Sequence, residues 1–496
     1  MRQFKKNRRT GTLSRFAASV ALAAAAGAGS EAMAEQWRVV PRLTLEQAYN
    51  DNIDLTTKGT ETSDFITSIS PGLSVRGTGR RLTLNFDYDP EQLFFLENSD
   101  RNELRQRFRG FSNAELLEQL LFVEAEGSVN QQFVNSTGGI GGTTLTSSRN
   151  LRTVQTYSIG PVVRNHLGSF ADAETRYKFS AFLVNDSTVS DVTQNELSFL
   201  LKSGRDFTDL AWDFNASASD AERQNGPAAF GGTDIERRLV KLNTQYAFNS
   251  TWSLLAGVGY ERIDDPTLFD APDGVIWDLG FQVRPNSVSS ARFTVGERFG
   301  GSNYNVEVNY IPSPLTRLRA NYIQTINTSQ TLGIQDLSTL GLSPQGALID
   351  QETGLPFLPG DPRFGLTNGA FRQDRFSAGI EHTSLRNRYT LDIFDEKRDF
   401  DVQTQNNTHS RGVILGFNRS LTPLLSFNLS GSYSVSTFEN QSDREDDLYS
   451  ANAGLSYRLS ETAQARFSYR HTERKSNAAN ADLAENFVAI TLLKEF

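Results

Sequence analysis

The chain has 496 residues, a formal net charge of −9 and no cysteine. Without cysteine it has no disulfide framework, no thiolate chemistry and no cysteine-linked lipid anchor. Residues 1–34 contribute +5, so the remaining chain carries −14, and this acidic balance argues against nucleic acid as a partner.

The first 34 residues have the parts of a secretory signal peptide. A basic start over Arg2–Arg15 precedes an Ala-rich apolar stretch at Phe16–Ala28, and small residues follow at Ala32-Met33-Ala34. A membrane-anchor helix is the alternative, but the apolar stretch is shorter than the roughly 20 residues that a span requires. We therefore predict a signal peptide over 1–34 and an exported domain over 35–496.

From Trp37 onward, apolar and polar residues alternate along nearly the whole chain. The segment L-S-F-N-L-S-G-S-Y-S-V-S-T at 425–437, for example, puts Leu, Phe, Tyr and Val on one face of an extended strand and Ser and Asn on the other. We count about 22 such segments of about 10–15 residues, longer than the usual strands of soluble sheets. Clear examples are Trp37–Tyr49, Leu82–Tyr88, Ala171–Leu183, Trp252–Tyr260, Tyr449–Leu459, Ala463–Tyr469 and Ala484–Phe496.

This pattern predicts an all-β protein with one transmembrane, antiparallel, up-and-down β-barrel of about 22 strands, within a range of about 16–24. A soluble β-sandwich is the alternative fold. Short links such as Gly77–Gly79 alternate with long polar segments such as Asp51–Glu61 and Asn135–Asn150. In outer-membrane barrels the short turns share the periplasmic rim, so both termini are predicted to be periplasmic. Two places fit poorly, because the link at Gly300–Ser302 is short on the long-loop side and Glu103–Phe111 alternates weakly.

The cost of placing charge in lipid indicates which face of each strand points outward. One face of Ala171–Leu183 carries Ala, Thr, Tyr, Phe and Leu, and the other carries Asp, Glu, Arg, Lys and Ser. An Arg or Lys against lipid at mid-depth costs roughly 2–4 kcal/mol, so the charged face is predicted to line a water-filled lumen. The residues predicted to line the lumen are Glu174, Arg176, Lys178, Arg466 and Arg470.

The segment 329–370 is the longest connection that the pattern predicts. It is rich in Gly and Pro but also contains Leu, Ile and Phe, which makes it too apolar for a free tail. Long loops of this kind are functional or disordered. We hypothesise that it folds over the mouth of the barrel or into the lumen and narrows the pore, and a surface flap or a partner-binding patch is an equally supported alternative.

The sequence has no catalytic or zinc-binding signature. The chain has four histidines: His166, His382, His409 and His471. His382 and Ser384 are predicted at a turn, whereas His409 and Ser410 are neighbours and therefore face opposite sides of a strand. No two histidines have the spacing of a zinc site. We expect polar rim or lumen residues here, and we expect no enzyme, no cofactor and no metal site.

Acidic residues cluster in two predicted outer loops, at 443–447 and at Asp264-Asp265. Such a cluster could hold a divalent cation that bridges to lipopolysaccharide phosphates. The spacing of a calcium loop is missing, however, so a solvated loop is the favoured interpretation.

Two stretches at the start of the exported domain carry a family resemblance. They read Trp37-Arg-Val-Val-Pro41-Arg-Leu-Thr-Leu with Tyr49-Asn-Asp51-Asn52-Ile53, and Asp64-Phe65-Ile-Thr-Ser-Ile-Ser-Pro71-Gly72-Leu. The chain resembles outer-membrane barrel proteins associated with PEP-CTERM/exosortase and exopolysaccharide loci, over the length of the exported domain. The resemblance implies an outer-membrane barrel tied to extracellular polymer production, with no catalytic residue to carry over.

The end of the chain resembles the signal that the barrel-assembly machinery reads. Phe496 is last, and Leu492, Ile490 and Val488 precede it at alternate positions, although Lys494 departs from the pattern. The expected partners are outer-membrane lipid and lipopolysaccharide, this machinery, and polysaccharide or export-system proteins.

The expected function is passive passage or export of a polar solute or a polysaccharide across the cell outer membrane. The width of the lumen and its fixed charges would then select what passes. The alternative is a plugged barrel that anchors a cell-surface assembly through its loops without conducting. A membrane-embedded enzyme is the third possibility.

Overall fold

The computed structural model describes residues 36–186, 188–226, 234–335, 340–342, 348–350, 365–401, 406–439 and 443–496. The signal peptide predicted over 1–34 lies outside these ranges, and so does much of the predicted loop 329–370. Within them, no helix is both long enough and apolar enough to cross a membrane.

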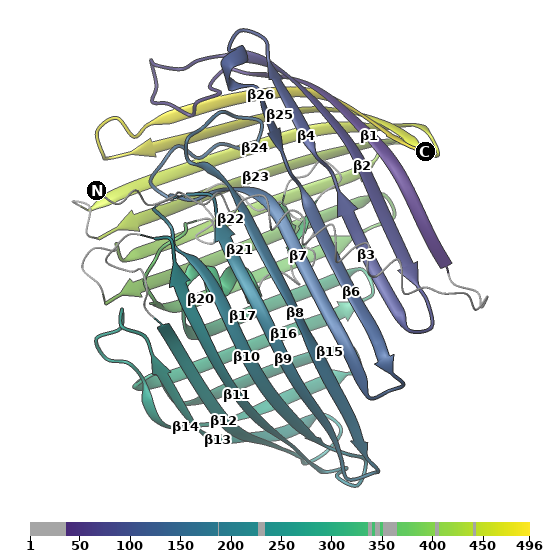
Figure 1. Ribbon diagram of the computed structural model, residues 1–496, viewed down its shortest axis with the longest axis vertical. Helices are drawn as coiled ribbons and strands as arrows, with labels where there is room; N and C mark the ends of the chain where they lie inside the picture. Colours follow the sequence, from purple (N-terminus) through teal and green to yellow (C-terminus); the bar gives the residue numbers. More distant parts are fainter. Residues whose placement is uncertain are drawn as a thin grey trace, which may run out of the picture.

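The described chain consists almost entirely of long antiparallel strands (Figure 1). The strands of the main sheet are β1 (Gln36–Asn50), β2 (Asp64–Thr78), β3 (Leu82–Tyr88), β4 (Glu91–Phe95), β5 (Glu103–Arg105), β6 (Phe108–Leu117), β7 (Leu121–Phe133), β8 (Leu151–Leu167), β9 (Ala171–Val184), β10 (Asp191–Ser203), β11 (Leu210–Gln224), β12 (Asp234–Ala247), β13 (Trp252–Asp264), β14 (Asp273–Asn286), β15 (Ser289–Arg298), β16 (Gly301–Ser313), β17 (Thr316–Asn327), β20 (Phe371–Thr383), β21 (Asn387–Phe400), β22 (Thr408–Ser420), β23 (Leu425–Phe438), β24 (Arg444–Ser460), β25 (Ala463–Ser476) and β26 (Leu483–Glu495). The other elements are the 3-10 helix η1 (Ser99–Arg101), helix α2 (Ser329–Gln335) and a separate hairpin of β18 (Leu340–Leu342) and β19 (Leu348–Asp350).

The main sheet closes on itself. Strand β1 pairs with β2 on one side and with β26 on the other, from Arg42↔Glu495 to Asn50↔Phe487. Strands β3 and β4 both pair with β2 and act as two halves of one strand. Strands β5 and β6 are likewise two halves of the next strand, because β5 pairs with β4 and β6 pairs with β3. With each of these two pairs taken as one strand, the described residues form a closed antiparallel barrel of 22 strands. The predicted fold and strand number are therefore confirmed, and two stacked sheets are excluded.

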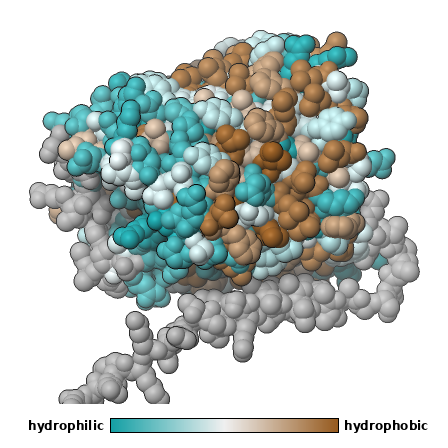
Figure 2. All heavy atoms as spheres, turned by 90° about the horizontal axis from the view of Figure 1, so that it is seen from above, coloured by the Kyte–Doolittle hydropathy of each residue, from teal (hydrophilic) through white to brown (hydrophobic). Residues whose placement is uncertain are grey.

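The side chains of each strand divide between the two faces of the wall. On β23, Leu429 is 46% exposed and Tyr433 is 37% exposed, whereas Ser434 on the other face is 9% exposed. Large apolar and aromatic side chains are exposed in this way around the barrel, and Figure 2 shows them gathered in a broad band on the visible face. A closed sheet pairs its backbone groups internally, so this apolar exterior can face lipid. The opposite, polar face lines the lumen.

Short turns and long connections separate onto two rims. The links 79–81 and 168–170 lie on one, the short-turn rim, and the connections 51–63 and 134–150 lie on the other, the long-loop rim. The start of β1 and the end of β26 both lie at the short-turn rim, as expected for an even number of strands. The assignment of this rim to the periplasm stays a prediction.

The short link predicted near Gly300–Ser302 is a tight hairpin turn on the long-loop rim. Phe299 and Gly300 join β15 to β16, with φ of 57° and 74°. Positive φ at both turn residues matches the twist of the two paired strands, so the hairpin closes without a longer loop.

Two stretches differ from the simple alternating pattern. The weakly alternating Glu103–Phe111 is interrupted, because β5 pairs with β4 whereas β6 pairs with β3 and β7. The acidic residues Glu445–Asp447 were expected in an outer loop, and this was wrong. They belong to β24, whose pairing with β23 continues to Phe438↔Arg444. Arg444 also supports the strand end, because its Nε and Nη2 donate to Asp446 at 2.8 and 2.7 Å.

Candidate functional site

The residues predicted to line the lumen on β9 join an ion-pair network. Glu174 and Arg176 lie on the face opposite to Tyr177, which is 42% exposed. Arg164 Nε of β8 donates to Glu174 at 2.9 Å, and Arg176 Nη2 donates to the same carboxylate at 3.1 Å. Glu124 of β7 accepts from both arginines, at 3.3 Å from Arg164. The four side chains therefore neutralise one another on the lumen surface.

The same chemistry continues along the lumen faces of β7–β15, which we name the ion-pair wall. Lys178 of β9 lies 3.5 Å from Glu196 of β10. Further along, Glu261 of β13 accepts from Arg237 of β12 at 2.8 Å and from Arg298 of β15 at 2.7 Å. Opposite charges on nearby strands thus satisfy each other across the sheet.

A cavity of about 530 Å³ lies against the ion-pair wall between β10 and β16. Lys241 and Asp278 form an ion pair in its lining, and Asn243 Nδ2 donates to Asp213 at 2.8 Å. Arg292 of β15 also lines this cavity, but it has no hydrogen bond or ion pair to any residue that the structure describes. This cavity leaves room for water or solute beside the paired charges.

Over much of β22–β24 the lumen face is built from short neutral side chains, and we name this part the serine wall. Its residues are Ser410, Gly412, Ile414, Gly416 and Asn418 of β22, Ser426, Asn428, Ser430, Ser432, Ser434 and Ser436 of β23, and Ser450, Asn452, Gly454 and Ser456 of β24. The hydroxyls of Ser410 and Ser436 lie 2.9 Å apart. Within the described chain, the side chains of Ser430, Ser432 and Asn452 have no hydrogen-bond partner. These groups are therefore available to water or to a solute.

The two predicted lumen arginines of β25 lie directly beside the serine wall. In the register of β24 and β25, Ser456 is opposite Arg466 and Asn452 is opposite Arg470. Neither arginine has a hydrogen bond or an ion pair among the described residues, and Nε of Arg466 is shielded from water. The structure thus separates the predicted residues into a paired set on β9 and an unpaired set on β25.

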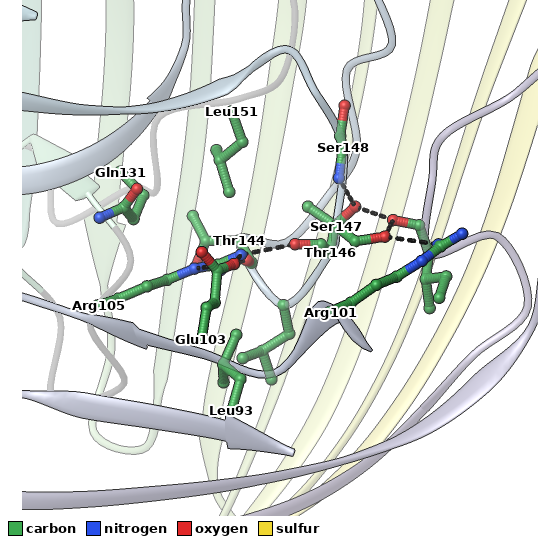
Figure 3. A network of polar contacts seen from close by, with 12 residues as sticks. Leu93, Arg101, Glu103, Arg105, Gln131, Thr144, Thr146, Ser147, Ser148 and Leu151 are labelled. Carbon is green, nitrogen blue, oxygen red and sulfur yellow. Dashed lines mark hydrogen bonds and ion pairs between the residues drawn. The ribbon is translucent and has the colours of Figure 1, made fainter. Parts of the chain in front are cut away.

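The connection between β7 and β8, loop 134–150, lies against the inside of the barrel (Figure 3). Arg105 of β5 is 5% exposed and points to the lumen, opposite to Leu104, which is 58% exposed. Its guanidinium group donates to the carbonyl oxygens of Thr144 and Thr146, at 2.7 Å for Thr146. A buried carbonyl without a partner costs about 1–3 kcal/mol, so Arg105 stabilises the inward position of the loop.

Loop 134–150 is also held by distant strands. Gly142 N donates to Glu485 Oε2 of β26 at 2.7 Å, and Arg444 Nη2 of β24 donates to Thr137 O at 3.1 Å. Leu145 is buried in an apolar cluster with lumen-facing residues of β1, β2, β4 and β26. The loop therefore extends along the inside of the barrel from β7 as far as β24.

The described ends of the predicted loop 329–370 turn inward as well. Helix α2 follows β17 and packs against β8 and β9, on a different part of the wall. Its Ile334 shares an apolar cluster with Phe182 and Val184 on the lumen face of β9, and Gln330 Nε2 donates to Ser190 O at 3.4 Å. The remainder of this loop lies largely outside the described residues.

The two inward segments meet near the serine wall. Leu366 N donates to Val134 O at 2.8 Å. Ile140 and Thr367 border a cavity of about 50 Å³ that is also lined by Ser410, Ser436 and neighbouring residues of β21–β25. Loop 134–150 and the 365–370 end therefore come together at the long-loop end of the serine wall.

The connection between β9 and β10 supports the second inward segment. Asp186 accepts from Arg152 Nε at 2.6 Å and from Thr188 N at 2.7 Å. Burial alone would raise the pKa of this carboxyl, but these hydrogen bonds and the charge of Arg152 lower its pKa below the ordinary value. Thr188 O accepts in turn from Asn368 Nδ2 at 2.7 Å, so this connection holds the end of segment 329–370.

The histidines are placed in contacts that do not resemble a catalytic pair. His382 Nδ1 lies 3.0 Å from Thr316 Oγ1, and His409 Nε2 lies 3.0 Å from Asp395. Ser410 faces the lumen and Ser436, on the other side of the strand from His409. The expectation that the chain is not an enzyme stays a prediction.

Comparison with known proteins agrees with the barrel architecture. A family model described as putative beta-barrel porin 2 matches residues 390–496, which run from β21 to the end of the chain. No curated protein matches the sequence. The porin-like fold, the apolar exterior and this match together indicate an outer-membrane protein.

Solved structures share the fold at low sequence identity. The FrpB iron transporter from Neisseria meningitidis is 10% identical, with a TM-score of 0.55 over 92% of this chain and 82% of that protein. The siderophore receptor PirA from Acinetobacter baumannii is 8% identical, with a TM-score of 0.52 over 92% of this chain and 80% of the receptor. These likenesses establish the fold alone.

The inward position of loop 134–150 was missed by the sequence analysis, which treated it as an ordinary outer connection. Gly138, Gly139, Gly141 and Gly142 are the signal that could have revealed it, because glycine allows close approach to another backbone. A Cβ atom on Gly139 would lie only 2.6 Å from Leu55 O. Nothing in the sequence, however, identifies the distant strands that receive the loop.

Proposed function

We propose that this chain is an outer-membrane channel through which a polar solute or a polysaccharide passes passively, with the short-turn rim in the periplasm. The observation that carries the proposal is the lumen face, which bears charged, hydroxyl and amide side chains behind an apolar exterior. Such a lining favours water inside the barrel. Its width and its fixed charges would then decide what passes.

The two inward segments would set the size limit of this channel. Both approach the long-loop end of the serine wall. Loop 134–150 is hydrogen-bonded to the distant strand β26, and the 365–370 end is hydrogen-bonded to the connection between β9 and β10. Bound in this way, they would act as fixed constrictions rather than as free flaps.

The link to polymer export belongs to the same proposal. It is supported by the resemblance of the exported domain to barrels of PEP-CTERM and exopolysaccharide systems. We propose polysaccharide and export-system proteins as partners, outer-membrane lipid and lipopolysaccharide as the surroundings, and Phe496 as the signal to the barrel-assembly machinery. FrpB is described as an iron transporter, and this supports transport as a task that the architecture can perform.

Single-channel recording in planar bilayers tests the proposal. The full exported chain is expected to give stable open steps. A variant with residues 137–147 replaced by Gly-Ser, and a second variant lacking 335–365, should each give larger steps because a constriction is removed. Deletion of 58–60, at the exposed tip of the connection 51–63, is the matched control and should leave the step size unchanged. Steps that stay the same in both variants would contradict the constriction.

A non-conducting barrel that anchors a surface assembly is the second candidate. The observation that favours it is the extent to which the two inward segments are fixed to the wall and to each other. The same recordings decide between the two candidates. Absence of open steps in the full chain and in both variants would exclude the channel and favour the anchor.

A further inference from the structure

The serine wall and its neighbouring strand form one continuous lumen surface. Gly416, Ser430, Asn452 and Arg470 are successive register partners across β22–β25. Adjacent strands lie about 4.8 Å apart, so these backbone positions follow one another at a spacing that one extended solute can contact at several points. Ser456 and Arg466 form the corresponding pair nearer to the short-turn rim.

Several polar groups of this surface make no hydrogen bond within the described chain. Within the described chain, Ser430, Ser432 and Asn452 make no side-chain hydrogen bond, and Arg466 has neither a hydrogen bond nor an ion pair. The contrast is the network around Glu124 on the ion-pair wall, where the carboxylate accepts from two arginines. Capacity for hydrogen bonding therefore remains open along the serine wall.

The chemistry of these groups selects a class of solute. Serine hydroxyls and asparagine amides both donate and accept hydrogen bonds, which suits a solute that carries many hydroxyl groups. Their short side chains lose little conformational entropy on contact, so each contact can be weak and reversible, as conduction requires. The guanidinium group adds a planar pair of donors that matches a carboxylate.

We propose that the serine wall together with Arg466 is a binding track for an acidic carbohydrate chain, that is, a polyhydroxylated chain that carries carboxylates. The proposal rests on the channel function and names its substrate class. Arg470 marks the outer end of the track, because Gly142 of loop 134–150 lies against its side chain. A chain on this track would thus reach loop 134–150.

The test is block of the channel current by tetragalacturonate, with neutral maltotetraose as the comparison probe. Tetragalacturonate is expected to block at lower concentration than maltotetraose. Arg466→Gln should raise the half-blocking concentration of tetragalacturonate about tenfold, the loss expected for one hydrogen bond to a charged group. The same variant should change the half-blocking concentration of maltotetraose by no more than about twofold. Arg466→Lys should restore part of the preference for the acidic probe.

Matched controls come from the other wall. Arg292→Gln removes a lumen arginine that also has no hydrogen bond or ion pair among the described residues. It should leave the half-blocking concentrations of both probes unchanged. Ser430→Val should weaken block by both probes, whereas Ser198→Val on β10 should not. Equal effects of Arg466→Gln and Arg292→Gln, or equal block by the two probes, would overturn the track.

Calorimetric titration of the detergent-solubilised barrel with tetragalacturonate separates this inference from the channel function. Binding that Arg466→Gln weakens, in a protein that shows no open steps, would overturn the channel but support the track. Open steps without binding or block would support the channel and overturn the track.

Discussion

The ion-pair wall and the serine wall follow the same alternation of residues, yet they present different side chains to the lumen. The ion-pair wall carries long charged side chains that bind one another, as Arg237 and Arg298 do with Glu261. The serine wall carries short neutral side chains with few contacts among themselves. Removing a member of the first wall therefore leaves a charged partner unpaired, whereas removing Ser430 or Ser432 from the second leaves no described partner. The two walls should respond differently to mutation.

The largest effect is expected at the long-loop end of the ion-pair wall. Arg223 and Asp265 are 0% and 1% exposed, and Nη2 of the arginine donates to the carboxylate at 2.8 Å. Arg223→Leu leaves this carboxylate buried without its countercharge, so the free energy of unfolding should fall by about 3–5 kcal/mol. Urea unfolding in micelles measures the loss.

The double variant Arg223→Leu, Asp265→Leu provides the control. It should recover much of the lost free energy, because the unpaired charge is then removed as well. Equal losses in the single and the double variant would mean that packing, rather than the charge, stabilises this end of the wall.

The second prediction compares the two faces of one strand. Leu429 faces outward on β23 and Ser430 faces the lumen. Leu429→Arg should lower the free energy of unfolding in lipid vesicles by roughly 2–4 kcal/mol, because the charge meets the lipid interior. Ser430→Arg should change it little, since water reaches that face. A comparable loss in both variants would contradict a hydrated serine wall.

A smaller effect is expected where the paired charges are partly exposed. Glu124→Gln weakens two arginine contacts, and solvent screening limits the loss to roughly 1–2 kcal/mol of unfolding free energy. Ser432→Ala is the matched change on the serine wall and should stay within about 0.5 kcal/mol of the unchanged protein. If both changes have the same effect in urea unfolding, the distinction between the walls does not extend to stability.

The smallest effect concerns acid. The pKa of Asp186 is lower in the folded chain than the ordinary value of about 3.9. Its contribution to stability is therefore present above that pH and is lost as the pH falls through the lower folded value. Below about pH 4, hydrogen exchange should increase in the connection 185–190 but not along β23, where the serine wall presents no titratable side chain.

Asp186→Asn supplies the check on this assignment. At neutral pH it should show the increased exchange of 185–190 that the unchanged protein shows only in acid. Exchange that rises in acid in the variant as strongly as in the unchanged protein would assign the effect to another group.

Much of the architecture was accessible from the sequence. The regular alternation in segments such as 425–437 gave the strands and their two faces, because side chains on a strand must alternate. The order of short and long connections gave an even strand number and termini on one rim. The distinction between strand and loop by composition failed at Glu445–Asp447. This strand end is charged like a loop, and only its pairing with β23 reveals the strand.

The alternation of residues by itself determined the wall: which segments are strands, which face meets lipid, and how many strands close the ring. These are local properties, since each depends on neighbours two positions apart. Only the tertiary structure decided which polar side chains of the lumen bind one another and which do not. The ion pair of Arg176 with Glu124, the lack of a hydrogen bond or ion pair at Arg466 among the described residues, and the inward path of loop 134–150 all depend on strands far away in the chain. A pattern of period two carries no information about partners that meet across the barrel.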